Sequence, residues 1–202
     1  MQTSSKTSKS KGEIEKILSQ EPRTDLSKEF SKASGVALLL SGSETNPELL
    51  FIKRALNPLD HWSGHLAFPG GKKDERDPDL LATCLREVRE EVGVLLHPKD
   101  LIGSLDDLQA RKRGHLLEFY IQPFVFFLPQ NPPLILDPRE VEKTYWIPLS
   151  YLMDERHRTE YQFDFSGNEL HLPGIRFPDG SVLWGLTFAM IENFFRKLKK
   201  GS

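Results

Sequence analysis

The sequence predicts an α/β domain in which helices cover a mixed β-sheet. Three observations predict it: apolar segments with strand character lie on both sides of one well-delimited helix, a second amphipathic helix lies near the end of the chain, and no internal repeat is visible. The chain has 202 residues, of which 38% are hydrophobic and 28% are charged. These values are ordinary for a globular protein with one core, so we expect one domain with an N-terminal extension.

The extension is expected to consist of a disordered tail, residues 1–12, and a helical segment, residues 13–34. The tail is rich in Ser, Thr and Lys, which is typical of a solvated segment. Its lysines could contact an acidic partner, although disorder alone explains the composition. Glu13–Gln20 and Leu26–Ala33 could each form a short helix. Residues 35–200 then form the main domain.

Short apolar segments predict the strands of the sheet. Gly35–Leu40 and Leu49–Ile52 are two such segments, and the turn-rich SGSETNPE between them indicates a loop. Further strands are expected at Leu101–Leu105, Glu118–Leu128 and Thr144–Ile147. The sheet therefore continues after the central helix.

The central helix is predicted over Pro78–Val92. Asp77 suits the N-cap, Pro78 suits the first helical position, and Gly93 suits a left-handed C-terminal cap. Leu183–Leu198 is predicted to be an amphipathic helix with a basic last turn, which complements the helix dipole.

Net charge and cysteine content limit the function classes. A net charge of −2 gives no general attraction to nucleic acids or anionic membranes, so any site for a polyanion has to be local. The single cysteine, Cys84, cannot form an internal disulfide, which fits a reducing compartment, and we expect it to pack in the core. No segment resembles a secretory signal or a membrane span. The expectation is a cytoplasmic protein with neither a nucleic-acid nor a membrane partner.

Three carboxylates mark one edge of the central helix. At about 100° per residue, Glu87, Glu90 and Glu91 fall within one arc, beside the apolar arc that faces the core. Like charges at this spacing weaken a helix by about 0.2–0.5 kcal/mol per pair, and a hard cation such as Mg²⁺ would remove the repulsion. A solvated charged face is the alternative. The preceding turn at Gly70 and Gly71 favours a site, because glycine lets the backbone approach a ligand closely.

This stretch resembles the Nudix box of the Nudix hydrolases. The likeness lies in an ordered pattern, Gly71-x5-Asp77-x8-Arg86-Glu87-Val88-x-Glu90-Glu91-x-Gly93-Val94. The resemblance implies the Nudix fold, an α/β/α sandwich with a mixed β-sheet, and an enzyme that uses Mg²⁺ or Mn²⁺ to hydrolyse a diphosphate linkage.

Further features resemble the coenzyme A diphosphatase-like branch of this family. In the box, aspartate stands at position 77 where the family normally has glutamate, and the gap from it to the arginine is one residue longer. Both differences also occur in that branch. Similar segments lie outside the box: Leu50-Phe51-Ile52-Lys53-Arg54, Gly64-x3-Phe68-Pro69-Gly70-Gly71 and Leu183-Trp184-Gly185-Leu186-Thr187. The likeness covers about residues 35–198.

The resemblance implies a nucleoside diphosphate derivative as the small-molecule substrate, with coenzyme A or acyl-coenzyme A first. An arginine common in that branch has no clear counterpart in ALNPLDHWSGH, so NDP-sugars, ADP-ribose and dinucleotides stay as alternatives. An alternative of another class is a nucleotide-sensing module without catalysis, which would be expected to lack a metal-binding glutamate; none is missing here. The resemblance also admits a homodimer, to which the N-terminal extension could contribute.

The resemblance assigns the metal site to Glu87 and Glu91, with Glu90 supporting and the Gly70 carbonyl as an extra ligand. Arg86 would orient the glutamates. The general base could be Glu87 or Glu91 beside the metal. It could also come from a later loop.

The later candidate for the base is Glu140, within Pro138-Arg139-Glu140-Val141-Glu142, although an exposed loop charge explains it equally well. Arg54 could bind phosphate through its planar guanidinium group. The basic segment ARKRGH could lie over the substrate. Aromatic residues Trp62, Phe68 and Trp184 could stack on an adenine or simply pack. The predicted substrate contacts are Arg54, Phe68, Gly71, Arg111 and Arg113.

Overall fold

The computed structural model describes residues 9–58, 62–112, 115–165 and 168–201. Its main sheet is built from β1 (Ala33–Ser41), β2 (Glu48–Arg54), β3 (Leu66–Ala67), β4 (Gly70–Lys72), β5 (Leu101–Ser104), β6 (Leu108–Lys112), β7 (His115–Leu128) and β8 (Val141–Pro148). A smaller sheet contains β9 (Arg158–Phe165), β10 (Asn168–Arg176) and β11 (Val182–Trp184). The helices are α1 (Lys11–Gln20), α2 (Leu80–Val92), α3 (Leu149–Met153) and α4 (Gly185–Lys200), with short 3₁₀ turns at Pro98–Asp100 and Glu155–His157.

The main sheet is mixed because β1 pairs in parallel with β7 and antiparallel with β2 and β4. Strands β3-β2-β1-β7-β5 follow one another across the sheet, while β8 pairs with β2 and β6 with β7. Strands β2 and β4 divide one edge of β1 between them. β2 pairs with its end at Leu40 and Ser41, and β4 pairs with its beginning at Ser34–Val36. This divided edge lies beneath α2.

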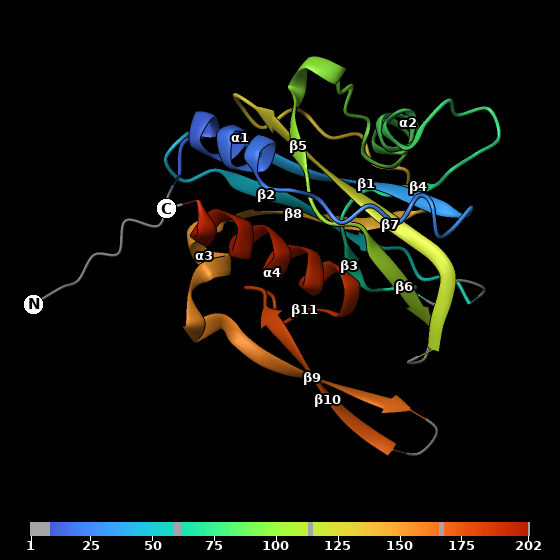
Figure 1. Ribbon diagram of the computed structural model, residues 1–202. Coiled ribbons are helices and arrows are strands. Elements are labelled where there is room, and N and C mark those ends of the chain that lie inside the picture. Colours follow the sequence, from blue (N-terminus) through green and yellow to red (C-terminus); the bar gives the residue numbers. More distant parts are fainter. Residues whose placement is uncertain (1–8, 59–61, 113–114, 166–167, 202) are drawn as a thin grey trace, which may run out of the picture.

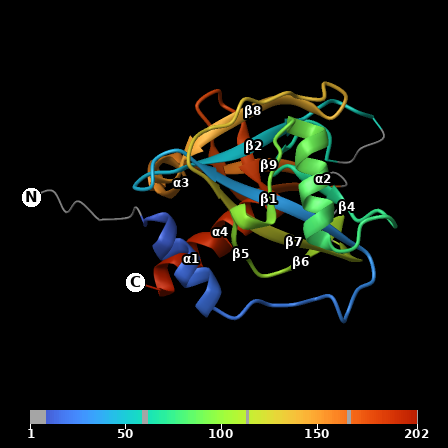
Figure 2. The ribbon, with the colours of Figure 1, turned by 90° about the horizontal axis from the view of Figure 1, so that it is seen from above.

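Helices cover both faces of the sheet, as Figures 1 and 2 show. Alternation along the fully buried β1 supplies both cores: Leu38 and Leu40 pack with α1 and α4, whereas Ala37 and Leu39 pack with α2. The predicted α/β/α sandwich with a mixed sheet is therefore confirmed. In the described residues, no helix is both long and apolar enough to cross a membrane.

The N-terminal extension differs from its prediction. Helix α1 begins at Lys11 rather than Glu13, because Ser10 and Glu13 form a capping box, so the predicted tail boundary at residue 12 is two residues too late. Residues 1–8 of that tail lie outside the described residues. The helix predicted at Leu26–Ala33 is wrong: after one turn at Leu26, the chain extends into β1. The segment is held at its beginning by Asp107, whose carboxylate accepts from Leu26 N–H at 3.0 Å, and at its end by the pairing of Ala33 with β7.

The two main helices also begin later than predicted. Asp79, not Asp77, caps α2, and its carboxylate accepts a hydrogen bond from Ala82 N–H at 2.8 Å. Gly93 ends α2 in the predicted left-handed conformation, with φ at +72°. Helix α4 begins at Gly185 because the preceding Val182–Trp184 pairs with β10 instead. The hairpin β9–β10, which extends at the bottom of Figure 1, was not predicted.

Candidate metal and diphosphate site

Three carboxylates meet beside the divided edge of β1. Glu87 and Glu91 lie one turn apart on α2, and Glu140 reaches them from the loop before β8. One oxygen from each side chain lies within 4.8 Å of the others. Carboxylate oxygens in this number and spacing suit a hard divalent cation such as Mg²⁺ or Mn²⁺.

Glu91 is the buried member of this carboxylate cluster, with 1% of its side chain exposed. It accepts a hydrogen bond from Gly70 N–H at 2.8 Å, and a guanidinium nitrogen of Arg54 lies 3.8 Å from its other oxygen. Burial raises the pKa of Glu91 to about 8, and the nearby Glu87 and Glu140 add to the rise, while Gly70 and Arg54 oppose it. Two local partners thus compensate only part of the cost of burying this charge, and a cation would compensate the rest.

Gly71 is required by the position of Glu87. A Cβ atom at residue 71 would lie 2.5 Å from Glu87 Oε2, so any side chain there would displace the carboxylate. Glu87 is itself half-buried, and burial raises its pKa. The Gly-Gly turn therefore makes room for the Glu87 carboxylate. Two predictions about this turn stay predictions: that Gly71 contacts the substrate, and that the Gly70 carbonyl binds the metal. The hydrogen bond between Gly70 and the Glu91 side chain uses the Gly70 N–H, not its carbonyl.

Arg86 organises the charges around the cluster. Its guanidinium donates to Asp77 at 2.8 Å, to Glu87 at 2.8 Å and to Glu90 at 2.9 Å. The same guanidinium holds the pKa of Asp77 well below its ordinary range. These contacts are those of a residue that orients Glu87.

Glu90 is not among the three clustered carboxylates, and its role as a supporting metal ligand stays a prediction. Its side chain is 58% exposed, and the carboxylate accepts a hydrogen bond from Arg86. Residues 87 and 91 share a line along α2 because they are four residues apart, whereas residue 90 is turned about 100° away from residue 91. Of the three glutamates predicted on one arc, Glu87 and Glu91 thus lie in the carboxylate cluster.

The third carboxylate arrives through the pairing of β2 with β8. Ala55 N–H donates to the Glu140 carbonyl at 2.8 Å, immediately after the register pair Arg54 and Val141. The loop before it docks on the end of α2, where Asp137 N–H donates to the Glu91 carbonyl at 3.0 Å. Glu140 keeps an exposed side chain. The position suits the role of general base that the sequence suggested.

The residues predicted to contact the substrate lie in different parts of the structure. Arg54, with 28% of its side chain exposed, lies at the cluster. Phe68 does not line the site: it is 4% exposed and stacks on Phe51 in the core, with the ring centroids 5.0 Å apart. Alternation along the chain turns its ring toward the α4 side of the sheet. Arg113 lies outside the described residues, and the backbone of Arg111 belongs to β6 while its side chain lies outside them.

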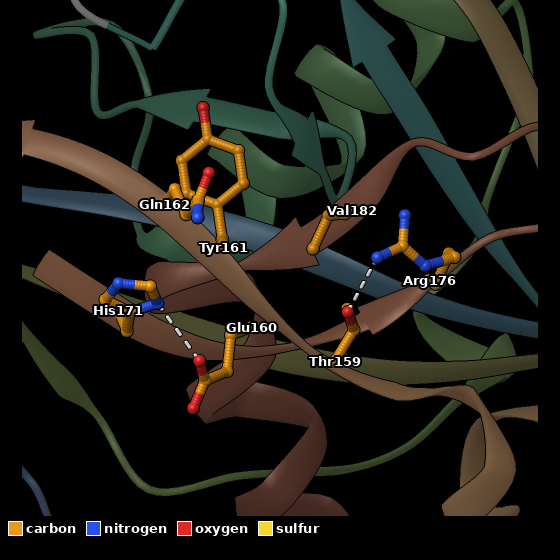
Figure 3. Close-up of a pocket in the computed structure, with 7 residues that line it drawn as sticks. All are labelled: Thr159, Glu160, Tyr161, Gln162, His171, Arg176 and Val182. Carbon is orange, nitrogen blue, oxygen red and sulfur yellow. Dashed lines mark hydrogen bonds and ion pairs between the residues drawn. The ribbon is translucent and has the colours of Figure 1, made fainter. Parts of the chain in front are cut away.

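An open pocket of about 630 Å³ lies on the smaller sheet and shares no residue with the carboxylate cluster. Figure 3 shows Tyr161 in it, together with an Arg176–Thr159 hydrogen bond and a His171–Glu160 pair. Gln162 and Val182 complete the lining. The alternating aromatic and polar residues of β9 were the sequence feature that could have indicated this strand.

Comparisons with known proteins agree with this geometry. A family model described as the NUDIX domain matches residues 31–164. An uncharacterized protein of Schizosaccharomyces pombe is 36% identical over 123 residues, which are 59% of this chain and 37% of that protein. The chain thus spans much less than the full length of that relative. An uncharacterized Nudix hydrolase, NudL, of Photorhabdus laumondii is 30% identical over 162 residues, 76% of this chain and 78% of the relative.

Solved structures show the same fold. A MutT/nudix family protein from Enterococcus faecalis aligns with a TM-score of 0.54 at 17% identity, over 95% of this chain and 74% of that one. The MutT protein from Methanosarcina mazei aligns with a TM-score of 0.51 at 19% identity, over 83% of this chain and 92% of that one. At these identities the likeness concerns the arrangement of strands and helices.

Proposed function

This chain belongs to the Nudix hydrolase family, and we propose that it is a Mg²⁺- or Mn²⁺-dependent pyrophosphohydrolase acting on coenzyme A or acyl-coenzyme A. The observation that carries the proposal is the carboxylate cluster of Glu87, Glu91 and Glu140, whose oxygens lie within 4.8 Å of one another. The choice of substrate rests on the similar segments around Arg54, Phe68 and Trp184.

Glu87 and Glu91 are the residues that would hold the divalent ion, with Glu140 beside them. The fit rests on the donor set itself: hard oxygen ligands, one of them buried and with its pKa raised to about 8 in the metal-free protein. When bound, such an ion neutralises charge on the diphosphate and favours the ionised form of an attacking water. Arg86 keeps Glu87 in place through their 2.8 Å hydrogen bond.

The remaining chemistry falls to Glu140 and Arg54. Glu140 accepts a proton from the water whose oxygen attacks one phosphorus. The bond between that phosphorus and the bridging oxygen breaks, and two phosphate-bearing products leave. Arg54, beside Glu91, offers planar N–H donors to the diphosphate oxygens.

Other substrates and one other class of function compete with this proposal. NDP-sugars, ADP-ribose and dinucleotides contain the same diphosphate linkage, and the segment between Arg54 and Gly64 lacks the arginine common in coenzyme A-type relatives. A nucleotide-sensing module without catalysis would not need a complete set of acidic groups. The presence of Glu87, Glu91 and Glu140 together favours the hydrolase.

A substrate panel tests the proposal. Coenzyme A, acyl-coenzyme A, ADP-ribose, NDP-sugars, NADH, dinucleoside polyphosphates and dNTPs are assayed with Mg²⁺ and Mn²⁺. We expect coenzyme A compounds to give the highest kcat/KM, and Glu91→Gln and Glu140→Gln to lower kcat by about 10²–10⁴-fold. Glu142→Gln is the matched control, since Glu142 is near in sequence but pairs with Lys53 at 2.7 Å instead.

Two results would decide against the proposal. Turnover of none of these compounds by the wild type would rule out the hydrolase activity on this class of substrate. Full activity in Glu91→Gln would show that the cluster is not the catalytic site. Preferred turnover of another compound in the panel would replace coenzyme A as the substrate and leave the pyrophosphohydrolase chemistry in place.

A further inference from the structure

Trp184 lies at the centre of a group of aromatic rings between the two sheets. Tyr161 of β9 stacks on it, with ring centroids 4.2 Å apart and an interplanar angle of 10°. His65 meets the same ring edge-on at 4.9 Å, and Phe163 lies tilted at 5.4 Å. We call His65, Trp184 and Tyr161 the aromatic stack. The three come from segments far apart in the sequence.

The aromatic stack begins next to the diphosphate site. Arg54 N–H donates to the His65 carbonyl at 3.0 Å, and the neighbouring register pair is Ile52 with Ala67. Opposite residues of an antiparallel pair share a face, so His65 lies on the face of the sheet that carries Arg54 and packs against α2. Arg54 lies 3.8 Å from Glu91, so the backbone of His65 is paired with a residue that lies at the carboxylate cluster.

Backbone pairing holds the central ring in position. Trp184 lies opposite Gly174 in the β10–β11 ladder, where a Cβ atom on the glycine would lie 2.6 Å from the carbonyl oxygen of Leu183. The first turn of α4 is tied to β3 by a hydrogen bond from Thr187 Oγ1 to the Leu66 carbonyl at 3.2 Å. The ring is therefore pre-organised before a ligand binds, which lowers the entropy cost of binding.

The outer member of the aromatic stack is accessible. Tyr161 lines the open pocket of about 630 Å³, and Figure 3 shows its ring standing clear of the Arg176–Thr159 pair. Arg176, on the same face of the small sheet as Tyr161, adds a guanidinium group to the lining. The rings of the stack are partly exposed, unlike the fully buried Phe51 and its partner Phe68 in the core. Aromatic surface beside hydrogen-bonding groups suits a planar heterocycle better than an aliphatic ligand.

We propose that Trp184 and Tyr161 form the subsite that binds the aromatic base of the substrate, with His65 connecting it to the diphosphate site. This proposal rests on the proposed function, because it assigns the group attached to the diphosphate that the carboxylates receive. The base stacks against the Tyr161–Trp184 pair, and polar groups of the pocket contact its edge. These residues then select substrates that carry a base.

Binding of AMP and of ribose 5-phosphate tests the subsite without requiring turnover. The two ligands have the same phosphorylated ribose, but only AMP has a base. In the presence of Mg²⁺, calorimetric titration of the wild type should give an AMP affinity at least about tenfold higher. Tyr161→Leu and Trp184→Leu should lower AMP affinity by about 5- to 100-fold and leave ribose 5-phosphate unchanged. Tyr161→Phe keeps the ring and should bind like the wild type.

The matched control removes a different stacked tyrosine. Tyr151 stacks on His157, with centroids 3.6 Å apart, outside the aromatic stack. Tyr151→Leu should keep the wild-type ratio of the two affinities. In wild-type protein, nuclear Overhauser contacts between AMP base protons and the Tyr161 ring provide a measurement that does not depend on the folding of any variant.

The outcomes separate this proposal from the proposed function. An unchanged AMP-to-ribose 5-phosphate ratio in both folded leucine variants overturns the subsite, as does the absence of contacts between bound AMP and Tyr161. Failure of the wild type to hydrolyse any diphosphate overturns the proposed function. The comparison of AMP with ribose 5-phosphate still tests, independently of turnover, whether the aromatic stack binds a base. In an active enzyme, the leucine variants should lower kcat/KM for the best substrate mainly through KM. Mg²⁺ should raise Tm in these variants as much as in the wild type.

Discussion

We expect Glu91→Gln to make the metal-free protein more stable, and increasingly so as the pH rises. The side chain is 1% exposed, and its oxygen accepts the Gly70 N–H bond, which a glutamine oxygen can also accept. The substitution therefore keeps the shape and the backbone hydrogen bond, and it removes a buried carboxylate charge. A residue required for activity would thus be one that costs stability in the absence of metal.

The size and sign of the effect follow from the pKa of Glu91, which is about 8 in the folded protein against an ordinary value of 4.5. The folded protein holds this proton more tightly than the unfolded chain. Its stability contribution is therefore fully present below about pH 4.5 and is lost as the pH rises to about 8. The full loss is on the order of 5 kcal/mol, of which about 2–3 kcal/mol falls between about pH 6 and pH 8.5.

Urea unfolding in EDTA, at a series of pH values, measures this difference. The free energy of unfolding of Glu91→Gln minus that of the wild type should grow by about 2–3 kcal/mol from about pH 6 to pH 8.5. Glu90→Gln is the control, because that side chain is 58% exposed and should show no comparable trend. Adding Mg²⁺ should stabilise the wild type more than Glu91→Gln. A pH-independent difference between the wild type and Glu91→Gln would refute the reasoning.

Three further predictions follow from the contacts at the site. Gly71→Ala should lower kcat at least about tenfold, because the new Cβ atom would displace the Glu87 carboxylate. Gly12→Ala is the control, since the space around Gly12 is open, and it should leave kcat unchanged. Equal kinetics in the two variants would contradict this prediction. Asp77→Asn should lower the free energy of unfolding by about 1.5–3 kcal/mol at pH 7, because it weakens the hydrogen bonds to Arg86. Urea unfolding should show that the stability difference between the variant and the wild type shrinks in acid, where the wild-type aspartate becomes protonated. Glu140→Gln should lower kcat by about 10²–10⁴-fold, and an unchanged kcat would exclude it as the base.

Local sequence determined the helix that carries the site. The left-handed cap at Gly93, the apolar face toward the sheet and the four-residue spacing of Glu87 and Glu91 depend on nearby residues, so they could be predicted. The same holds for the longer buried strands, whose apolar runs specify them. The Asp77 cap was wrong because the sequence offers two aspartates, and the ion pair with Arg86 left Asp79 to cap the helix.

Only the tertiary structure decided which distant groups share the site. Glu140 joins Glu91 because β2 pairs with β8, and Phe68 turns into the core because β3 pairs with β2. The aromatic stack around Trp184 needs the β9–β10 hairpin, whose alternating residues gave no indication of where it would dock. The sequence by itself thus specified the acidic helix and the family of the chain. The partners of that helix depend on strand pairings between residues far apart in the chain, whose register local propensity does not determine.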